Sequence, residues 1–397
     1  MTLQSKRVTV LVTGGIAAYK TCEFVRLLVK HGADVRVSMT EHATHFVGTV
    51  TFEALTGHPV LLTEWAGTDG TIPHIELNRD CDLLVVMPAS ANILAKAACG
   101  IADDLVSSTI LARRSPVLFV PAMNMYMWRN PATQRNVATL KGDGCLFAGP
   151  AEGYQACGDT GEGRMMEPVD VFDLVTGIFQ EKPLAGRHVV VTAGPTYEAI
   201  DDVRGITNLS SGRQGYAVAR AARNAGARVT LVSGPVSLRT PALVKRLDVV
   251  SAADMHRTVM ETLDADPADL FIAVAAVADW QVEKVEGKIK KEKGEIPQLA
   301  FSENPDILAD VAARGDVAVT VGFAAEAEKL EDYARRKCVK KGCRLVVGNL
   351  AKDALGSDKN SVLFVTPESA EAFGPAPKAR VADEIIARAV RLLNDNQ

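Results

Sequence analysis

The sequence lacks the features of a membrane, exported or zinc-binding protein. No run approaches the roughly 20 apolar residues of a membrane-spanning helix, and the opening segment MTLQSKRVTVLV has no apolar stretch of signal-peptide length. The net charge is only −4, so nothing predicts a nucleic-acid or membrane partner. The seven cysteines form no C-x-x-C pair, which argues against a zinc cluster and indicates reduced thiols in the cytoplasm.

The length and one repeated local pattern predict two α/β domains. A chain of 397 residues with 47% hydrophobic content has enough material for two cores. A strand, a glycine-containing turn and a helix follow one another from Lys6, and a similar series starts at the apolar run 189–191. We therefore expect the chain to divide near residue 184.

In the first half, apolar runs alternate with helical patterns, which predicts a parallel sheet with helices on both faces. Ligands of such sheets bind outside the carboxyl ends of the strands, so the residues after each strand are the most informative. The expected strands are 8–12, 34–39, 82–87, 117–120 and 145–147, and the expected helices are 17–30, 51–55, 93–112 and 131–140.

Glycine and polar residues follow these strands. The turn after the first strand contains Gly15, and the second strand ends at Ser38. Ser90 begins the helix after the third strand, and Met123 and Asn124 follow the fourth. The first turn is not a GxGxxG segment, a serine at a helix start is usually a cap, and methionine usually fills a core. Polar ends on three adjacent strands nevertheless favour one phosphate-bearing cofactor.

The second half repeats the alternation and is also predicted to be a parallel α/β domain. It has no GxxxxGK[ST] segment, which excludes a Walker P-loop, but Ser211 and Gly212 precede a helix and present a hydroxyl and amides to an anion. Asp279 follows a buried strand. The lysine-rich run at 288–293 could simply be a solvated face. The alternation of Lys288 and Lys290 with Ile289 instead favours a loop that folds onto a polyphosphate. The expected strands are 189–192, 229–233, 248–251, 270–275, 317–322, 345–348 and 361–365.

Segments of the first half resemble the flavin-containing cysteine decarboxylases. These segments are GGIAAYK, PHI at 73–75, PASANILAKAACGIADDL and PAMNMYMW, and ACGDTGEGR at 156–164 looks like the flexible substrate clamp of that family. The resemblance implies that FMN lies at the strand ends. Its expected contacts include Gly15, Ser38, Ser90 and Met123.

The same resemblance implies three catalytic residues. His74 would be the active-site base, Asn124 would hold the substrate carboxylate, and Cys157 would donate a proton. In this chemistry the flavin oxidises the CH₂–SH group of an N-acylated cysteine, so the electrons left by CO₂ delocalise onto sulfur, and later returns the hydride. A histidine that titrates near neutrality suits thiol deprotonation, and a thiol on a glycine-rich loop suits protonation upon closure.

Segments of the second half resemble phosphopantothenate–cysteine ligase, namely ITNLSSGRQG, AAVADW, KIKK, ENPDI and VGFAAE. The resemblance implies that Asn208 handles an acyl-nucleotide intermediate and that Lys288 neutralises charge on the phosphates or the leaving pyrophosphate. The family commonly has threonine after FAAE, where this chain has Ala327. The nucleotide contacts that it implies are Ser211, Gly212, Asp279, Lys288, Asn304, Phe323, Lys337 and Lys341.

Both resemblances together imply an α/β fold with two Rossmann-like domains. We expect an N-terminal flavodoxin-like flavoprotein domain at residues 1–180, a linker at 181–186 and a C-terminal parallel-sheet nucleotide-binding domain at 187–397. The implied function is that of a bifunctional enzyme of coenzyme A biosynthesis. One half would join 4′-phosphopantothenate to cysteine through an acyl-cytidylate, with CTP and Mg²⁺. The other would decarboxylate 4′-phosphopantothenoylcysteine to 4′-phosphopantetheine with FMN.

Some points stay open at this stage. CTP rests on the resemblance alone, and the metal ligands are unknown. A non-catalytic flavin-binding regulatory subunit would not need His74, Asn124, Cys157 and Lys288 together, and an FMN decarboxylase of peptidyl cysteine would not need a nucleotide-binding half. The families also imply sites built between subunits. We therefore expect a cytoplasmic homo-oligomer, a dodecamer of trimers and dimers, with small-molecule substrates and no nucleic-acid or membrane partner.

Overall fold

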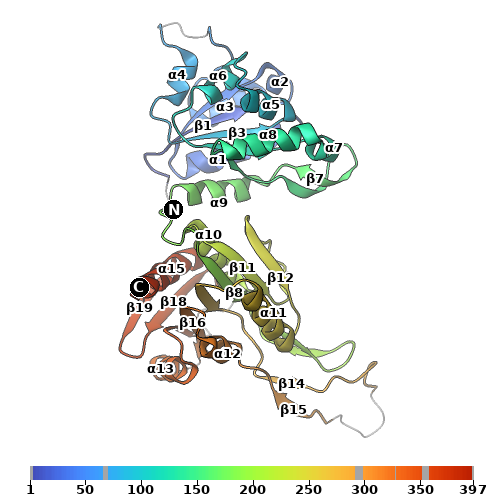
Figure 1. Ribbon diagram of the computed structural model, residues 1–397, viewed down its shortest axis with the longest axis vertical. Coiled ribbons are helices and arrows are strands. Elements are labelled where there is room, and N and C mark those ends of the chain that lie inside the picture. Colours follow the sequence, from blue (N-terminus) through green and yellow to red (C-terminus); the bar gives the residue numbers. More distant parts are fainter. Residues whose placement is uncertain (1–2, 66–69, 291–297, 327, 351–356, 396–397) are drawn as a thin grey trace. The chain divides into compact units, whose positions relative to one another are not determined.

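The computed structural model describes residues 3–65, 70–290, 298–326, 328–350 and 357–395. The chain divides into two compact units, Met1–Phe179 and Gln180–Gln397, each with a sheet covered by helices (Figure 1). The residues predicted as a linker, 181–186, belong to the second unit. None of the helices in the described ranges is long and apolar enough to cross a membrane.

The first unit is built on a five-stranded sheet in the order β2-β1-β3-β4-β5, and all its strand pairs are parallel. This order is flavodoxin-like, with the topological switch point between β1 and β3, and it confirms the predicted fold class. Strand β3 is buried along its whole length because helices cover both faces of the sheet. The strands are β1 Arg7–Val12, β2 Asp34–Met39, β3 Leu83–Ala89, β4 Val117–Pro121 and β5 Leu146–Phe147.

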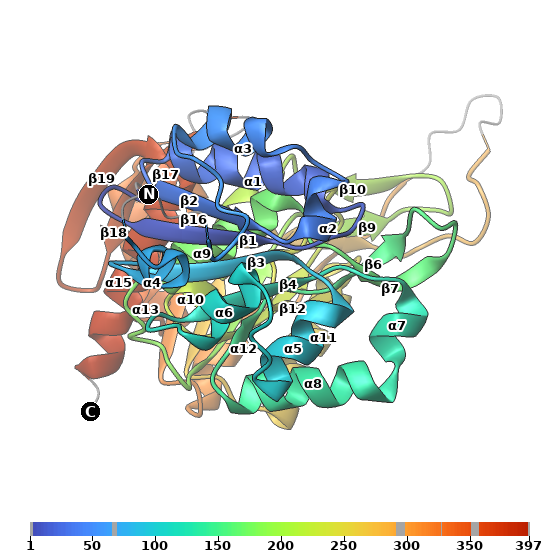
Figure 2. The ribbon, with the colours of Figure 1, turned by 90° about the horizontal axis from the view of Figure 1, so that it is seen from above.

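Helices cover the two faces of this sheet in separate groups (Figure 2). On one face α1 packs against α3 and α9, whereas α5, α6 and α8 bury the apolar side chains of β1, β3 and β4 on the other. The short helices α2, α4 and α7 lie in connections. The bounds are α1 Ala18–Lys30, α2 Glu41–Thr44, α3 Thr49–Thr56, α4 Pro73–Asn78, α5 Ala91–Cys99, α6 Leu105–Leu111, α7 Met125–Arg129, α8 Pro131–Gly142 and α9 Pro168–Ile178.

The prediction of one helix at 93–112 is wrong, because the chain forms α5 and α6 there. Gly100 ends α5 with a left-handed φ of 69°, a conformation that glycine adopts without strain. Asp104 then starts α6 through a capping box with Ser107. The apolar pattern continues on both sides of this break, so the hydrophobic periodicity alone did not reveal it.

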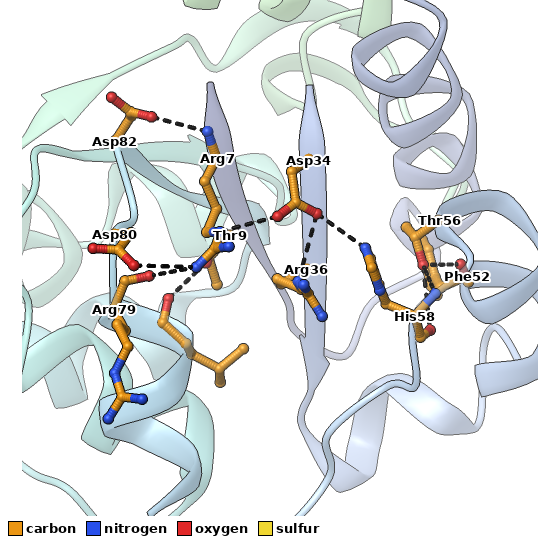
Figure 3. A network of polar contacts seen from close by, with 11 residues as sticks. Arg7, Thr9, Asp34, Arg36, Phe52, Thr56, His58, Arg79, Asp80 and Asp82 are labelled. Carbon is orange, nitrogen blue, oxygen red and sulfur yellow. Dashed lines mark hydrogen bonds and ion pairs between the residues drawn. The ribbon is translucent and has the colours of Figure 1, made fainter. Parts of the chain in front are cut away.

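A polar network joins the amino ends of β1 and β2, opposite the ligand-binding edge of the sheet (Figure 3). Nε of Arg7 donates to Oδ2 of Asp34 at 3.0 Å, and Nε2 of His58 lies 2.9 Å from Oδ1 of the same carboxylate. Nε of Arg36 lies 3.5 Å from Oδ1. Burial alone would raise the pKa of Asp34, but Arg36, Arg7 and His58 outweigh it and hold that pKa below the usual 3.8.

Replacing Asp34 by asparagine should destabilise this unit slightly. Partly exposed ion pairs contribute about 0.2–1 kcal/mol each, so we expect Asp34→Asn to lower the midpoint of thermal unfolding by a few degrees at pH 7. A lowered folded-state pKa stabilises the fold above the unfolded-state pKa, and this contribution is lost as pH falls through the folded-state value. Circular dichroism should therefore show the difference shrinking below about pH 4. Asp80→Asn, which removes a carboxylate that is 80% exposed, serves as the control and should change little.

The second unit contains an eight-stranded sheet in the order β12-β11-β8-β13-β16-β17-β18-β19. The first six strands are parallel and follow the Rossmann order, whose switch point lies between β8 and β13. The strands are β8 His188–Ala193, β11 Arg228–Ser233, β12 Val244–Asp248, β13 Leu270–Ala273, β16 Val319–Glu326, β17 Leu345–Leu350, β18 Lys359–Val365 and β19 Ala370–Pro377.

Two predictions about these strands are wrong. The expected parallel strand at 361–365 belongs to β18, which pairs antiparallel with β17 and with β19. A parallel crossover needs a dozen or more residues, and the connections at 351–358 and 366–369 are shorter. The strand expected at 248–251 is found earlier, as β12. Residue 251 is not available to a strand, because Ser251 forms the N-terminal cap of helix α11 together with Asp254.

The helices of this unit also form two groups. Helices α10 and α15 pack on one face of the sheet, and α11, α12 and α13 pack on the other. Two small antiparallel pairs, β9–β10 and β14–β15, lie outside the main sheet. The bounds are β9 Tyr197–Ala199, β10 Gly205–Thr207, α10 Arg213–Asn224, α11 Ala252–Ala265, β14 Trp280–Val282, β15 Phe301–Glu303, α12 Ile307–Arg314, α13 Leu330–Lys341 and α15 Lys378–Asn394.

Candidate active sites

A cavity of about 860 Å³ lies at the carboxyl ends of β1, β3 and β4 in the first unit. It brings together five of the predicted residues: Gly15, Ser90, Met123, Asn124 and Cys157. Ligand pockets usually enclose about 300–1,000 Å³, so this cavity has room for a cofactor and a substrate. It also lies at the switch point of the sheet, where ligands of this fold bind.

The ends of β1 and β3 are fixed to each other beside this cavity. The buried hydroxyl of Thr13 donates to the carbonyl of Pro88 at 2.7 Å and accepts from the backbone N–H of Ser90 at 3.1 Å. Oγ of Ser90 accepts from the N–H of Ile93 at 3.3 Å, so Ser90 is the helix cap that the sequence predicts. A Cβ at Gly14 would lie 2.6 Å from Cβ of His42, so the first turn needs glycine there.

A hairpin of β6 (Ala151–Tyr154) and β7 (Thr160–Arg164) closes one side of the cavity and lies beside α7 (Figure 1). The buried side chain of Gln155 accepts from the N–H of Met125 at 3.2 Å and donates to the carbonyl of Glu162 at 3.1 Å. The N–H of Met123 donates to the carbonyl of Gly163 at 3.0 Å. These contacts fasten the predicted substrate clamp to the connection between β4 and α7.

Asn124 and Cys157 meet at the tip of this hairpin. Oδ1 of Asn124 caps α7 by accepting from the N–H of Tyr126 at 2.9 Å, so the amide group Nδ2 points toward the hairpin. Nδ2 lies 3.3 Å from Sγ of Cys157 and donates to Oδ2 of Asp159 at 2.9 Å. The thiol of Cys157 donates to the same oxygen at 3.3 Å. Asp159 belongs to the segment that carries the resemblance, yet sequence reasoning gave it no role.

Two cations of the cavity wall were also missed. Lys20 and Arg164 line the cavity, and both pair with the carboxylate of Glu167. Burial alone would raise the pKa of Glu167, but these cations and their hydrogen bonds hold it below its usual value. Lys20 is the last residue of the segment GGIAAYK. Its position on the first helix after β1 could have indicated from the sequence that it lies beside the cavity.

Two of the predicted residues lie outside the cavity lining. Ser38 is fully buried, and its hydroxyl donates to the carbonyl of Leu61 at 2.9 Å. His74 lies on α4, where its Nδ1 is 3.8 Å from Oε1 of Glu64, beyond hydrogen-bond distance. The structure of one chain therefore does not bring His74 to Asn124 and Cys157.

The second unit has a cleft at the carboxyl ends of β13 and β16. It consists of two cavities of about 580 and 470 Å³ that share the wall residues Asp279, Phe323 and Lys337. The larger cavity also contains three predicted residues, Asn208, Ser211 and Gly212, and the smaller one contains Asn304 and Lys341. Further polar residues to which the sequence analysis assigns no role also line the cleft, among them Gln214, Glu303, Glu326, Lys340, Asn349, Asn360 and Lys378.

The start of α10 provides backbone donors to the larger cavity. Gly212 precedes the helix with a φ of 73°, and no side chain caps this end. The N–H groups of the first turn therefore face a ligand or water. Gly215 allows α10 to approach the sheet, because a Cβ there would lie 2.5 Å from Cβ of Ala193. Nδ2 of Asn208 donates to the carbonyl of Ala276 at 2.9 Å, which holds Asn208 against the end of β13.

Cations and an unsatisfied amide mark the smaller cavity. Nζ of Lys337 donates to the carbonyl of Phe323 at 2.6 Å, and burial lowers the pKa of this ammonium group, although Cys343, Glu326 and Asp279 counteract it. Lys341 pairs with Asp306. Nδ2 of Asn304 donates to the carbonyl of Ala278 at 2.9 Å, whereas its buried Oδ1 accepts no hydrogen bond from a described residue. Such an acceptor suits a ligand that carries N–H or O–H groups.

Lys288 lies in an exposed loop outside the lining of both cavities. The loop is held on either side of this lysine. The N–H of Gly287 donates to Asp202 at 2.9 Å, and that of Ile289 donates to Asp201 at 3.1 Å. Ala327 and the lysines at 291 and 293 lie outside the described residues. Within the described part of the chain, no three His, Cys, Asp or Glu side chains form a group that could hold a metal ion.

Comparison with known proteins supports the family resemblance of both halves of the chain. Residues 1–180 match the family model Flavoprotein, and residues 184–393 match the DNA/pantothenate metabolism flavoprotein C-terminal domain. The chain is 44% identical over 394 residues to the coenzyme A biosynthesis bifunctional protein CoaBC of Vibrio vulnificus (strain YJ016), with 97% of each chain covered. The CoaBC of Bacillus subtilis (strain 168) is 44% identical over 91% of this chain and 90% of its own. That of Escherichia coli (strain K12) is 45% identical over 88% of this chain and 87% of its own. This chain therefore belongs to the family of bifunctional coenzyme A biosynthesis enzymes.

Proposed function

We propose that the first unit is an FMN-dependent decarboxylase that converts 4′-phosphopantothenoylcysteine to 4′-phosphopantetheine. The observation that supports this most is the meeting of the Cys157 thiol and the Asn124 amide in one cavity at the switch point of a flavodoxin-like sheet. The match to the Flavoprotein model supports a flavin as the cofactor. The name of the CoaBC relatives supports a substrate from coenzyme A biosynthesis.

The residues of the cavity fit FMN. Gly15 follows the first strand, and Ser90, whose Oγ accepts from a backbone N–H, lies at the start of α5, where a phosphate finds amides and a hydroxyl. Met123 and the apolar residues Ile16 and Ala122 suit the face of a ring system. When bound, FMN would supply the two-electron oxidation of the substrate CH₂–SH group and take part in the later reduction.

The three catalytic side chains have separate roles in this proposal. Nδ2 of Asn124 donates to the substrate carboxylate and orients it for loss of CO₂. Cys157 carries on Sγ the proton that the carbon needs once CO₂ has left. His74 accepts the proton of the substrate thiol. The last task requires His74 from a second copy of the chain, because in one chain His74 lies outside the cavity lining.

We propose accordingly that the enzyme is a homo-oligomer, with a dodecamer of decarboxylase trimers and ligase dimers as the assembly. Large exposed apolar side chains support an interface in the first unit, among them Tyr19, which lines the cavity, and Trp65 and Ile72. We also propose a cytoplasmic location, which the seven free cysteines support.

We propose that the second unit is the ligase, which joins 4′-phosphopantothenate to cysteine with CTP and Mg²⁺. A carboxylate acylates an amine only when its oxygen becomes a good leaving group, and an acyl-cytidylate meets this need. The uncapped start of α10, with Ser211 and Gly212, suits phosphate oxygens, and Lys337 and Lys341 supply positive charge. Asp279, Asn304 and Phe323 would hold the nucleoside, Asn208 the acyl-cytidylate, and Lys288 the leaving pyrophosphate.

Separate assays of the two units test this proposal. The purified full chain with FMN should release CO₂ from 4′-phosphopantothenoylcysteine without any nucleotide. With 4′-phosphopantothenate, cysteine, CTP and Mg²⁺, it should release pyrophosphate and CMP. If ATP or GTP replaced CTP at equal rates, the assignment of CTP would be wrong, and if the folded protein with bound flavin released no CO₂, the decarboxylase would be wrong.

A further inference from the structure

Asp159 accepts a hydrogen bond from the side-chain amide of Asn124, which is the donor that the proposed reaction needs for the substrate carboxylate. Nδ2 of Asn124 donates to Oδ2 of Asp159 at 2.9 Å, and the thiol of Cys157 donates to the same oxygen at 3.3 Å. The second N–H of Nδ2 faces Sγ of Cys157 at 3.3 Å, and Oδ1 accepts from the N–H of Tyr126 at 2.9 Å, so both amide hydrogens of Asn124 already have a partner. One carboxylate oxygen of Asp159 therefore accepts from both the Asn124 amide and the Cys157 thiol.

The substrate carboxylate needs the same amide group. Two carboxylates within a few ångströms of each other repel, and the repulsion is stronger in a partly enclosed cavity than in water. Asp159 must therefore leave Asn124 when the substrate carboxylate arrives. It can return when that carboxylate has departed, because CO₂ is uncharged.

We propose that Asp159 is a positioning residue that takes the place of the substrate carboxylate on Asn124 before the substrate binds. The proposal rests on the decarboxylase function proposed for the first unit. While the substrate carboxylate lies on Asn124, the Cys157 thiol is free of Asp159. When CO₂ has left its electron pair on the substrate, Asp159 returns to Asn124 and brings the thiol back into the cavity. The proton then passes from Sγ to the carbon that lost CO₂, and solvent reprotonates the thiolate. Asp159 itself gains and loses no proton.

The hairpin tip allows this exchange without unfolding of the clamp. The N–H of Gln155 donates to the carbonyl of Asp159 at 2.8 Å, and Gly158 has a φ of 94°, so residues 155–159 form a closed turn. The side chain of Gln155 holds this turn to Met125 and Glu162. Rotation of the Asp159 side chain leaves these backbone contacts unchanged.

Two ligands that differ in the carboxylate test the proposal in the FMN-loaded full chain. 4′-Phosphopantothenoylserine keeps the carboxylate but has no thiol to oxidise, and 4′-phosphopantetheine has no carboxylate. Asp159→Asn removes the charge and keeps the size. By calorimetry, we expect this variant to bind the serine analogue roughly tenfold more tightly than the wild type, since a competing charge is gone, and to bind 4′-phosphopantetheine equally. Its kcat for decarboxylation should fall roughly tenfold, because the thiol is no longer returned.

A matched control lies on the same hairpin. Glu152 on β6 is exposed and lies outside both the clamp segment and the cavity lining, so Glu152→Gln should leave both affinities and kcat unchanged. A purely structural Asp159 predicts that Asp159→Asn weakens both ligands alike, and that result would overturn the proposal, as would unchanged binding of the serine analogue. Asp159→Ala should give the same sign if the asparagine variant folds poorly. If the wild type releases no CO₂, the proposed function fails, whereas a failed affinity difference in an active wild type rejects only the role of Asp159.

Discussion

Serine in place of Cys157 should slow multiple-turnover release of CO₂ by at least about 100-fold, the usual contribution of a positioned proton donor. Cys157 is exposed at the hairpin tip and packs against no core, so the fold should be unaffected. The hydroxyl of serine can replace the thiol in the contacts with Asn124 and Asp159, but it is a much weaker acid. We therefore expect normal flavin content and normal substrate binding in the variant.

The flavin absorbance distinguishes a lost proton donor from a lost binding group. With excess substrate and no oxygen, the Cys157→Ser variant should lose its visible flavin band once and not recover it, because the reaction stops after oxidation of the substrate. Cys99→Ser, an exposed cysteine at the end of α5 and outside the cavity lining, is the control and should turn over normally. Full turnover by Cys157→Ser would exclude the assigned role.

Methionine in place of Lys337 should lower kcat/KM for CTP by about 10–100-fold, since hydrogen bonds of charged groups contribute about 1.5–3 kcal/mol. Lys337 lies on the wall that both cavities of the cleft share, and methionine fills nearly the same volume. Decarboxylation of supplied 4′-phosphopantothenoylcysteine should be unaffected. The control is Arg336→Met on the same helix, whose side chain lies outside both cavities and should leave the ligase unchanged.

The pH profile gives an independent check of Lys337. Burial lowers the pKa of this ammonium group below the ordinary 10.5, so its positive charge is lost as pH rises through the lowered value. The wild-type kcat/KM for CTP should therefore fall on the alkaline side at a lower pH than for an ordinary lysine, and the methionine variant should lack this decline. An alkaline decline that is the same in both proteins would show that another group causes it.

The sequence predicted the sheets well, because their signal is local. Strands such as β3 and β8 are buried throughout and mostly apolar, which is typical of parallel strands covered on both faces. The errors occurred where a cap or a short connection decides the structure. Gly100 divides a predicted helix, and Ser251 starts α11 where a strand was expected. The antiparallel edge of the second sheet follows from connection length, which the apolar pattern of β18 does not show.

The candidate sites could be predicted only in part. Residues that follow the strands, such as Ser90 and Asn124 close behind them and Asp279 six residues past β13, line the cavities because the carboxyl ends of parallel strands meet at one edge. Lys337 was predicted only through the resemblance. Asp159 was given no role, because no local pattern indicates that one of its oxygens accepts from both Asn124 and Cys157 across the hairpin. The roles of all the site residues stay predictions, and His74 and Lys288 also lie outside the linings of the three cavities described above.

The most direct test of the account follows pyrophosphate and CO₂ in one reaction. The full chain receives 4′-phosphopantothenate, cysteine, CTP, Mg²⁺ and FMN, and both products are measured over time. The account predicts equal final amounts of the two, with pyrophosphate first and no CO₂ when CTP is omitted, because the amide made by the second unit is the substrate of the first. Pyrophosphate without CO₂ would contradict the assignment of Asn124 and Cys157. Neither product, from folded protein with bound flavin, would contradict both enzymatic activities and indicate a regulatory flavoprotein.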